Sequence, residues 1–113
     1  MSKETIKAKS FVEKLRMIDP EMQLQSVMAL LLISEGHETE SWYTVKELAK
    51  KIGISPASAS RNVAVLSKWN RHDKKGHDLV VSWENPKKRV EKFVKLTSKG
   101  KRFMQELKKA FVQ

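Results

Sequence analysis

The stretch from Ser55 to Val63, with the sequence SPASASRNV, surrounds the single guanidinium of Arg61 with small side chains. On a helix of about 100° per residue, the apolar side chains of Ala59, Val63 and Leu66 share one face. Arg61 lies on the opposite face, where it can donate two parallel hydrogen bonds to a guanine edge, and its small neighbours suit a helix in the major groove. We therefore predict that this helix contacts DNA through Ser55, Ala57, Ser58, Ser60, Arg61, Asn62 and Lys68.

A second group of cations surrounds a predicted tight turn between residues 84 and 88. Residues 79–83 and 89–96 are rich in β-branched and aromatic side chains, so they predict two strands with this turn at the tip of a hairpin. Such a tip can reach a narrow minor groove, where arginine gains most from the strong negative potential. The cations that we expect to contact DNA from the hairpin are Lys87, Lys88, Arg89 and Lys92.

The chain of 113 residues carries its charge unevenly. Residues 1–44 contain five Lys/Arg and seven Asp/Glu, a net charge of −2, whereas residues 45–113 contain eighteen and six, a net charge of +12. The whole chain therefore carries +10. A basic region of this strength predicts a polyanionic partner, and nucleic acid is the commonest one in the cytosol.

Each of these features also has a purely structural interpretation. Alanine and serine are tolerated on any exposed helix, where the guanidinium would simply be solvated. Lysines at a hairpin tip protect an exposed strand edge against aggregation, and a basic surface raises solubility. For the lysines at the tip both interpretations stay open, whereas for Arg89 we favour a contact with DNA.

Other chemistry finds little support in the sequence. There is no cysteine, which excludes disulfides and thiolate metal sites. Two histidine-aspartate pairs, at 72–73 and 77–78, match no recognised zinc spacing, and lysines at 74 and 75 flank them. No phosphate-binding loop, carboxylate pair in an apolar frame or serine nucleophile motif is present, so we expect no enzyme, metal or cofactor. Without an apolar run of about 18 residues or a secretion signal, we expect a cytoplasmic protein.

One domain, residues 1–113, must position these groups. Its content of 40% hydrophobic and 32% charged residues is typical of a folded protein. An amphipathic helix is predicted over residues 1–19, and Asp19-Pro20 should end it and begin a second helix that runs to about Glu35. Because the second helix is apolar around most of its circumference, we expect it at the centre of the core, with Gly36 as its end.

A helix-turn-helix is predicted over residues 44–69. Thr44 and Glu47 fit a capping box that begins a short helix, and Gly53 suits the left-handed turn that would end it. Ser55-Pro56 combines a cap with a proline at the first helical position, so it should begin the helix that carries the arginine. We expect the helix that begins at Ser55-Pro56 to run to about Trp69.

The hairpin then forms a wing over residues 79–96, and Thr97 caps a last helix over residues 97–113. A hairpin that follows a helix-turn-helix is the arrangement of winged DNA-binding domains. The predicted fold class is therefore mainly α with a small β-hairpin wing (α+β), a winged helix-turn-helix.

Several short motifs occur in a fixed order: Glu47-Leu48-Ala49, Gly53-Ile54-Ser55, Ser60-Arg61-Asn62-Val63, Leu66 and Leu96-Thr97-Ser98-Lys99-Gly100-Lys101. In this order residues 44–107 resemble the winged-helix core of MarR-type transcriptional regulators, in which the last motif ends the wing. The resemblance implies a DNA-binding homodimer on a partly palindromic site, with the arginine-bearing helix in the major groove and the wing in the minor groove. The chain departs from the family in the wing, where Lys88 replaces an aspartate and Arg89 comes one position early.

The resembling family has two long C-terminal helices for dimerisation, whereas this chain ends about 16 residues after Thr97. A homodimer would therefore use the first and last helices, through Phe11, Leu15, Ile18, Phe103, Leu107 and Phe111. The alternative is that both apolar stripes complete the core of the monomer. Many members of the family bind small ligands near the dimer interface, but no residue set here indicates such a site, so no small-molecule effector is predicted.

Two functions follow as hypotheses. In the first, the protein is a sequence-specific transcriptional regulator of double-stranded DNA, most simply a repressor that occupies a palindromic operator as a homodimer. In the second, it is a replication-origin or architectural DNA-binding protein that uses the same winged helix. RNA binding is a weaker third hypothesis, because the aromatic residues of a single-strand platform are not expected on an exposed sheet.

Overall fold

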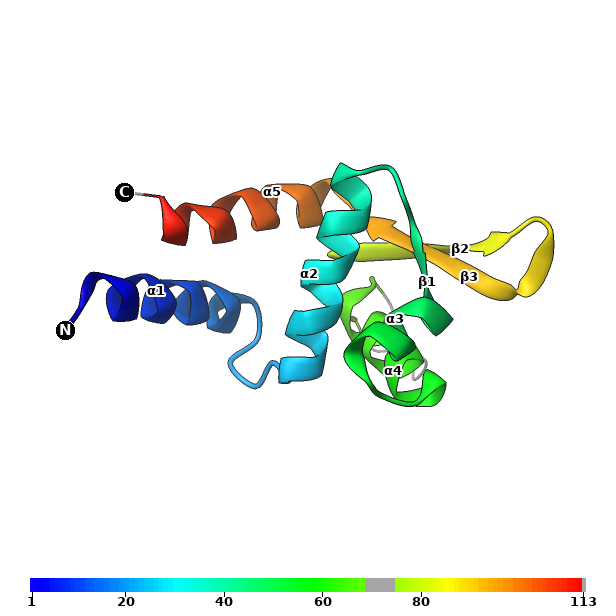
Figure 1. Ribbon diagram of the computed structural model, residues 1–113, viewed down its shortest axis with the longest axis horizontal. Helices are drawn as coiled ribbons and strands as arrows, with labels where there is room; N and C mark the ends of the chain where they lie inside the picture. Colours follow the sequence, from blue (N-terminus) through cyan, green and yellow to red (C-terminus); the bar gives the residue numbers. More distant parts are fainter. Residues whose placement is uncertain (69–74, 113) are drawn as a thin grey trace.

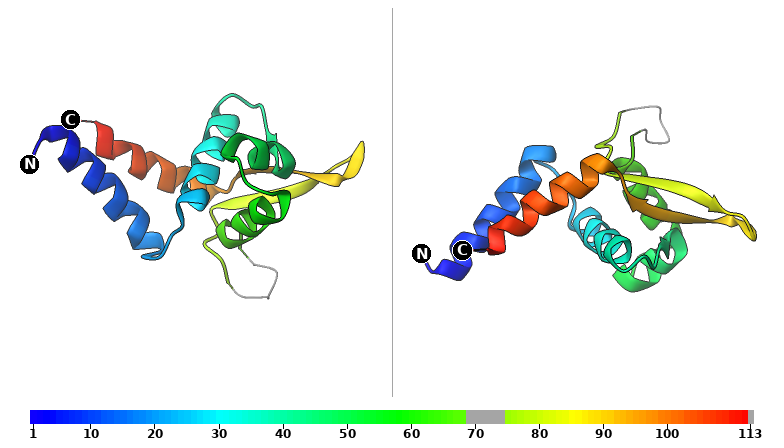
Figure 2. Two further views of the ribbon diagram at one scale, coloured as in Figure 1. Left: turned by 60° about the horizontal axis from the view of Figure 1, so that its bottom comes forward. Right: turned by 90° about the horizontal axis from the view of Figure 1, so that it is seen from above.

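A computed structural model describes residues 1–68 and 75–112, without the side chain of Arg89 (Figure 1). In chain order its elements are α1 (Lys3–Ile18), α2 (Leu24–Glu38), β1 (Tyr43–Thr44), α3 (Val45–Ile52), α4 (Pro56–Leu66), β2 (Val80–Asn85), β3 (Lys88–Leu96), α5 (Ser98–Lys108) and the 3₁₀ turn η1 (Lys109–Phe111). Helices α1 and α5 lie side by side as an arm that carries both termini, while the β2–β3 hairpin projects from the other end (Figures 1 and 2). The predicted winged helix-turn-helix fold is confirmed.

Helix α2 begins and ends later than the sequence predicted. Asp19 ends α1, and its Oδ1 accepts a hydrogen bond from the backbone N–H of Glu21 at 2.9 Å. This contact forms a turn around Pro20, so α2 begins at Leu24 and the prediction that Asp19-Pro20 starts the helix is wrong.

Within the described residues, 1–68 and 75–112, no helix has the length and apolar composition that crossing a membrane requires.

Gly36 lies inside α2 instead of ending it. A Cβ atom at this position would lie 2.8 Å from the carbonyl oxygen of Ser41 and 3.1 Å from the ring of Tyr43. The backbone N–H of Ser41 donates to the carbonyl oxygen of Gly36 at 2.9 Å. Glycine is therefore required here because the chain that leads into β1 folds back closely against the helix.

The predicted caps of α3 and α5 are confirmed. Thr44 Oγ1 accepts from the N–H of Glu47, and Glu47 Oε1 accepts from the N–H of Thr44, both at 3.1 Å. Gly53 follows α3 with a φ of 82°, a left-handed conformation that glycine adopts without strain. Thr97 Oγ1 accepts from the N–H of Gly100 at 2.9 Å and so caps α5.

Helix α4 begins as predicted, because Ser55 Oγ accepts from the backbone N–H of Ser58 at 3.1 Å. The proline at the first helical position has no N–H that would need a partner there. The helix ends at Leu66, so it is shorter than the predicted range, and Trp69 lies outside the described residues.

The three strands form an antiparallel sheet in the order β1–β3–β2. Strands β2 and β3 pair along the hairpin, and their register shifts near the tip, between Glu84 and Asn85. Strand β1, which the sequence did not predict, places Tyr43 opposite Val94. A strand of two residues is too short to show the alternation of apolar and polar residues from which a strand is predicted. This short strand ties the helix-turn-helix to the wing.

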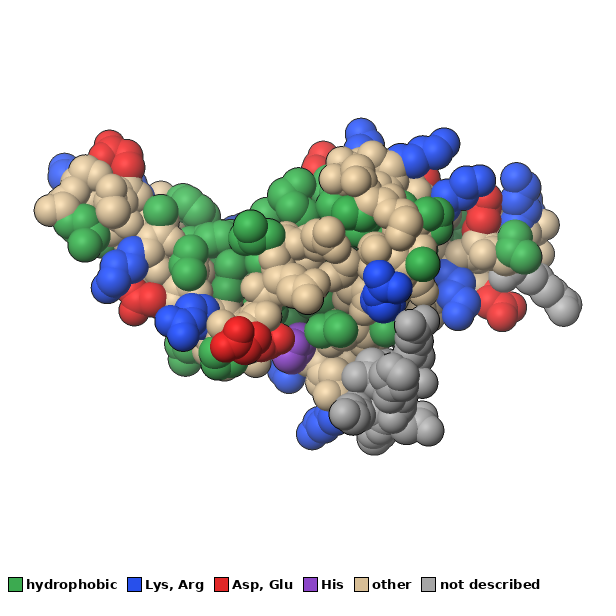
Figure 3. Space-filling view, turned by 90° about the horizontal axis from the view of Figure 1, so that it is seen from below, with side chains coloured by type: hydrophobic (Ala, Val, Ile, Leu, Met, Phe, Trp, Pro, Cys, Tyr) green, Lys and Arg blue, Asp and Glu red, His purple; other side chains and the backbone are tan. Residues whose placement is uncertain are grey.

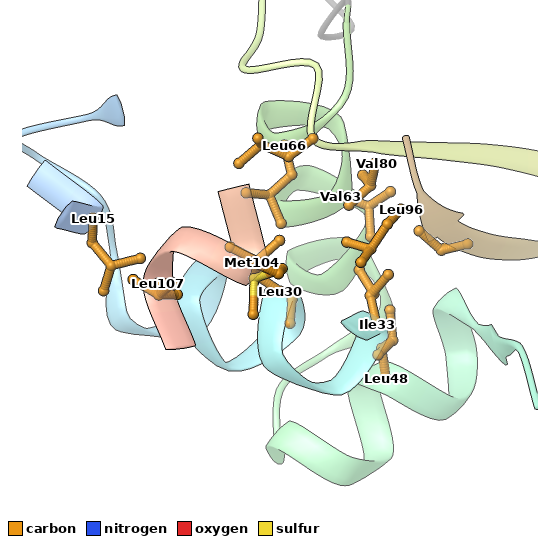
Figure 4. Packing of buried hydrophobic residues seen from close by; sticks show 13 residues of the cluster. Leu15, Leu30, Ile33, Leu48, Val63, Leu66, Val80, Leu96, Met104 and Leu107 are labelled. Atoms are coloured by element: carbon orange, nitrogen blue, oxygen red, sulfur yellow. The ribbon is translucent and has the colours of Figure 1, made fainter. Parts of the chain in front are cut away.

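The core forms around α2, as predicted (Figure 4). Leu30 and Ile33 of α2 are fully buried among side chains of the helix-turn-helix, the hairpin and α5. The other residues labelled in Figure 4 are Leu15, Leu48, Val63, Leu66, Val80, Leu96, Met104 and Leu107. Because α4 contributes two of these side chains, its opposite face has a fixed orientation relative to the rest of the molecule.

A row of aromatic rings supports the hairpin on the other face of the sheet. Val94 of β3 is buried in the core, so its neighbour Phe93 points away from the core. The ring of Trp83 lies 5.6 Å from that of Phe93, and Trp42 meets Trp83 edge-on at 5.8 Å. His37, near the end of α2, continues the row at 5.4 Å from Trp42. The row thus joins α2 to the base of the wing.

The pKa of His37 lies below its ordinary value of 6.5, first because burial disfavours the charged ring and then because Lys101 and Lys95 repel an added proton. The unfolded chain therefore binds a proton here more readily than the folded chain does. The free energy of unfolding should fall as the pH is lowered from 6.5 toward the folded pKa.

Urea unfolding followed by tryptophan fluorescence, at several values between about pH 5 and pH 7, measures this effect. The variant His37→Gln should lose less stability on acidification than the wild-type protein, because the amide does not titrate. An equal loss in the two proteins would show that His37 does not contribute.

Candidate nucleic-acid interface

The exposed face of α4 carries most of the residues predicted to contact DNA. Ala59, Val63 and Leu66 are buried, as predicted, so the opposite face of the helix is turned to solvent. Ala57, Ser60 and Arg61 of α4 are exposed, as is its cap Ser55, and Ser58 is half-buried. Lys68 is also exposed but lies beyond the end of α4. The face thus combines short side chains, which allow close approach, with one long guanidinium.

Hydroxyl groups hold the side chain of Arg61 along the helix. Nη2 of Arg61 donates to Ser58 Oγ at 3.0 Å, and Ser55 Oγ donates to the same oxygen at 3.0 Å. The guanidinium is therefore drawn toward the N-terminal turn of α4. Unpaired backbone N–H groups give this end of a helix a positive partial charge, so Arg61 and the helix end both favour an anion or a hydrogen-bond acceptor.

Asn62 does not lie on the exposed face of α4, which speaks against its predicted contact with DNA. The residue is only 5% exposed. Its Oδ1 accepts from Ser26 Oγ at 2.7 Å, and its Nδ2 donates to Gln25 Oε1 at 3.2 Å and to the Ser58 carbonyl oxygen at 2.9 Å. Asn62 therefore joins α4 to the start of α2. The only sign of this in the sequence was a serine in the apolar α2 segment, which needs a partner when buried.

The hairpin presents its lysines to solvent. Lys87, Lys88 and Lys92 are exposed. Lys88 Nζ lies 3.9 Å from the Glu91 carboxylate, a contact between partly solvated groups that contributes little to stability. The backbone of Arg89 belongs to β3, and its side chain lies outside the described part of the structure, so its contact with DNA stays a prediction.

A groove of about 520 Å³ separates α4 from the hairpin. Lys68 lines it just beyond the end of α4, and Lys92 lines it from β3, with Ser60 and Asp78 also present. The sequence assigned the two lysines to different sites, but the tertiary structure places both in one groove. A groove with a cation on each side suits a phosphate backbone that passes between a helix and a wing.

A second cavity of about 380 Å³ continues this surface toward α3. Ser60 and Lys92 line both cavities, and Lys46 of α3 lines the second one. Sequence analysis did not single out Lys46, because a lysine on a short amphipathic helix normally indicates no more than a solvated face. Its proximity to the hairpin makes it a further candidate for a phosphate contact.

The histidine-aspartate segment takes part in structural contacts. His77 Nε2 lies 3.1 Å from Asp19 Oδ2, which connects the α1–α2 turn to the segment before β2. Lys99 Nζ donates to the carbonyl oxygen of His77 at 3.0 Å. In residues 1–68 and 75–112 no three His, Cys, Asp or Glu side chains gather as a metal-binding group, and His72 and Asp73 lie outside these ranges.

The residues predicted for dimerisation are largely used within one chain. Leu15 and Leu107 are buried in the core, and Ile18 and Phe103 pack against it. The ring of Phe11 lies 5.3 Å from that of Phe111, so these two side chains contact each other within the arm. Leu15 and Leu107 therefore complete the core of the monomer, whereas Phe111 remains 55% exposed, so the arm keeps an apolar surface.

The buried contacts of Asn62 lead to a prediction about stability. Asn62→Ala would leave Ser26 and Gln25 without this partner, so we expect the free energy of unfolding to fall by about 1–3 kcal/mol. Urea unfolding gives this value directly. Ser60→Ala, on the exposed face of the same helix, is the matched control and should change it by less than about 0.5 kcal/mol. Similar losses in both variants would contradict the proposed anchor.

No protein-family model matches the sequence, and no curated protein matches it. Solved structures do match its fold. MepR of S. aureus, in the crystal structure of a MepR-DNA complex, is 16% identical, with 93% of this chain and 73% of MepR covered at a TM-score of 0.73. The MarR crystal structure is also 16% identical, with 95% of this chain and 71% of MarR covered at a TM-score of 0.68.

The transcriptional regulator PA4135 is 16% identical, with 92% of this chain and 69% of PA4135 covered at a TM-score of 0.61. At such low identities the similarity concerns the arrangement of helices and strands. It covers the arm, the helix-turn-helix and the hairpin together. The chain therefore has the winged helix-turn-helix fold of MarR-type regulators, which its sequence motifs predicted.

Proposed function

We propose that this protein is a sequence-specific transcriptional regulator that binds double-stranded DNA, most simply a repressor that acts as a homodimer on a palindromic operator. The observation that carries the proposal is the exposed face of α4, where small side chains surround an arginine held by Ser58. The fold comparison supports it, because MepR has this fold in a complex with DNA and PA4135 is a transcriptional regulator. The proposed role is binding and involves no catalysis.

In the proposed complex α4 lies in the major groove. Ala57 and Ser60 allow the helix to approach the base edges, and Arg61 donates two hydrogen bonds to one guanine. A bidentate contact of this kind discriminates against other bases by about 1–3 kcal/mol. The hydroxyls of Ser55 and Ser58 lie at the N-terminal turn, where a phosphate oxygen is favoured.

The groove between α4 and the hairpin binds the DNA backbone in this arrangement. Lys68 and Lys92 line it, and Lys46 continues the basic surface toward α3. These contacts position the protein without reading sequence. The hairpin tip then reaches the adjacent minor groove with Lys87, Lys88 and Arg89.

Two copies of the chain would bind two half-sites whose centres lie about 10–10.5 base pairs apart, on one face of the duplex. Each copy adds a net charge of +10, so affinity should depend strongly on salt. Occupation of such a site near a promoter would exclude polymerase, which is the simplest mechanism of repression.

The experiment that tests the proposal is selection of bound sequences from a random duplex library at about 150 mM salt, where weak charge-driven binding is partly screened. Enrichment of an inverted repeat would support a dimeric regulator. Direct repeats would support a replication-origin protein, and binding without enrichment would support an architectural one. Failure to bind duplex DNA at all would overturn every one of these roles.

Substitutions in α4 and in the hairpin should have different effects. Arg61→Lys keeps the charge but loses the bidentate geometry, so we expect it to lose about 1–3 kcal/mol of base discrimination and to retain binding to random DNA. Lys87→Ala should weaken binding to all sequences alike and reduce the slope of log affinity against log salt by about 0.9. Fluorescence anisotropy with the selected site and a scrambled duplex, over a range of salt concentrations, measures both effects. If Arg61→Lys weakened binding to both duplexes equally, α4 would not be the reading helix.

A further inference from the structure

The groove between α4 and the hairpin contains a carboxylate at a place where phosphate is expected. Of the described residues that line it, two are cationic, Lys68 and Lys92, and one, Asp78, is anionic. On the face shown in Figure 3, lysine and arginine side chains are spread over the end of the molecule that carries the hairpin. A carboxylate in such basic surroundings repels the phosphates that the groove is proposed to bind.

The backbone of Asp78 is held in a left-handed conformation, with a φ of 57°. Its N–H donates to the carbonyl oxygen of Ser67 at 3.2 Å, and its own carbonyl oxygen accepts from Thr97 Oγ1 at 2.7 Å. The neighbouring N–H groups of His77 and Leu79 donate to carbonyl oxygens at the end of α4, at 3.1 and 2.8 Å. The segment thus satisfies the last carbonyl groups of the helix and fixes Asp78 at the groove.

Conformation alone does not explain an aspartate at this position. Left-handed backbone favours glycine, and asparagine adopts it as aspartate does, so either residue would fit without adding a charge. Asp78 also lies beside the C-terminal end of α4, where the partial charge of the helix is negative and disfavours an anion. A carboxylate that neither the backbone nor the helix end favours indicates a role outside the fold.

We propose that Asp78 is a specificity-determining residue that excludes phosphate from the part of the groove nearest to it. When Arg61 binds its guanine, α4 is held at one position and the phosphates lie against Lys68 and Lys92. On other sequences no base contact holds α4, so the DNA backbone can settle wherever it gains most contacts, and repulsion by Asp78 weakens these complexes more. The inference rests on the proposed DNA-binding function and adds a residue that acts against wrong sequences.

The test is Asp78→Asn, which removes the charge and keeps a residue that adopts the left-handed conformation. Binding is measured by fluorescence anisotropy at about 150 mM salt, with the selected site and a scrambled duplex. Affinity for the scrambled duplex should rise about tenfold, whereas affinity for the selected site should rise less than about threefold. On the scrambled duplex the slope of log affinity against log salt should steepen by about 0.9, because one more phosphate is bound.

Two further variants separate the role of this carboxylate from net charge and from folding. Glu4→Gln, at the exposed start of α1 and far from the hairpin (Figure 1), changes the net charge equally. It should leave both affinities within about twofold of the wild type, because salt screens so distant a charge. Asp78→Gly also removes the carboxylate and takes a positive φ without strain, so it should match Asp78→Asn. The circular dichroism of all three variants should stay that of the wild type.

The same titrations distinguish failure of this inference from failure of the proposed function. If the wild type prefers its selected site, equal rises on the two duplexes, or an effect no larger than that of Glu4→Gln, would overturn the inference. In that case loss of the preference in Arg61→Lys would leave the reading role standing. If the wild type bound every duplex equally and both Asp78 variants bound about tenfold more tightly, the repulsion of phosphate would stand and the sequence-specific function would be wrong.

Discussion

The attachment of α4 to α2 is the constraint on which the DNA-binding face depends. Val63 and Leu66 bury apolar area in the core around α2. The free energy gained from such burial is large, but it does not depend on the direction of the contact. The buried contact from Ser26 to Asn62, at 2.7 Å, depends on direction and joins two residues that are 36 positions apart. Packing therefore sets how closely the helices approach, and the hydrogen bonds set the rotation of α4 about its axis.

That rotation decides what α4 presents to solvent. With Ala59 and Asn62 turned inward, Ala57, Ser60 and Arg61 are turned outward. Ser58 lies between the two faces and contacts both, because its hydroxyl accepts from Arg61 and its carbonyl oxygen accepts from Asn62. The residue that fixes the helix and the residue proposed to read a base thus share one serine. A preorganised donor of this kind loses less conformational entropy when it binds.

Charge divides the molecule into a basic part and a weakly acidic part. The basic part, residues 45–113, carries the helix-turn-helix and the hairpin, and its charge of +12 attracts a polyanion from a distance. The N-terminal part, residues 1–44, has a net charge of −2 and includes the segment from Leu24 to Ser34, which contains no charged residue. Long-range attraction to a polyanion therefore acts on the part that carries α4 and the hairpin.

The sequence by itself determined the local features: the capping box at Thr44, the glycine turn at Gly53, the cap at Ser55 and the order of motifs that predicted the winged helix. These depend on residues within a few positions of one another, so their physical causes are visible in a short window. Tertiary structure alone decided the start of α2, the need for Gly36, the two-residue strand β1, the burial of Asn62 and the groove that joins Lys68 to Lys92. Each of these depends on which distant segment lies opposite, and composition and periodicity contain no information about that partner.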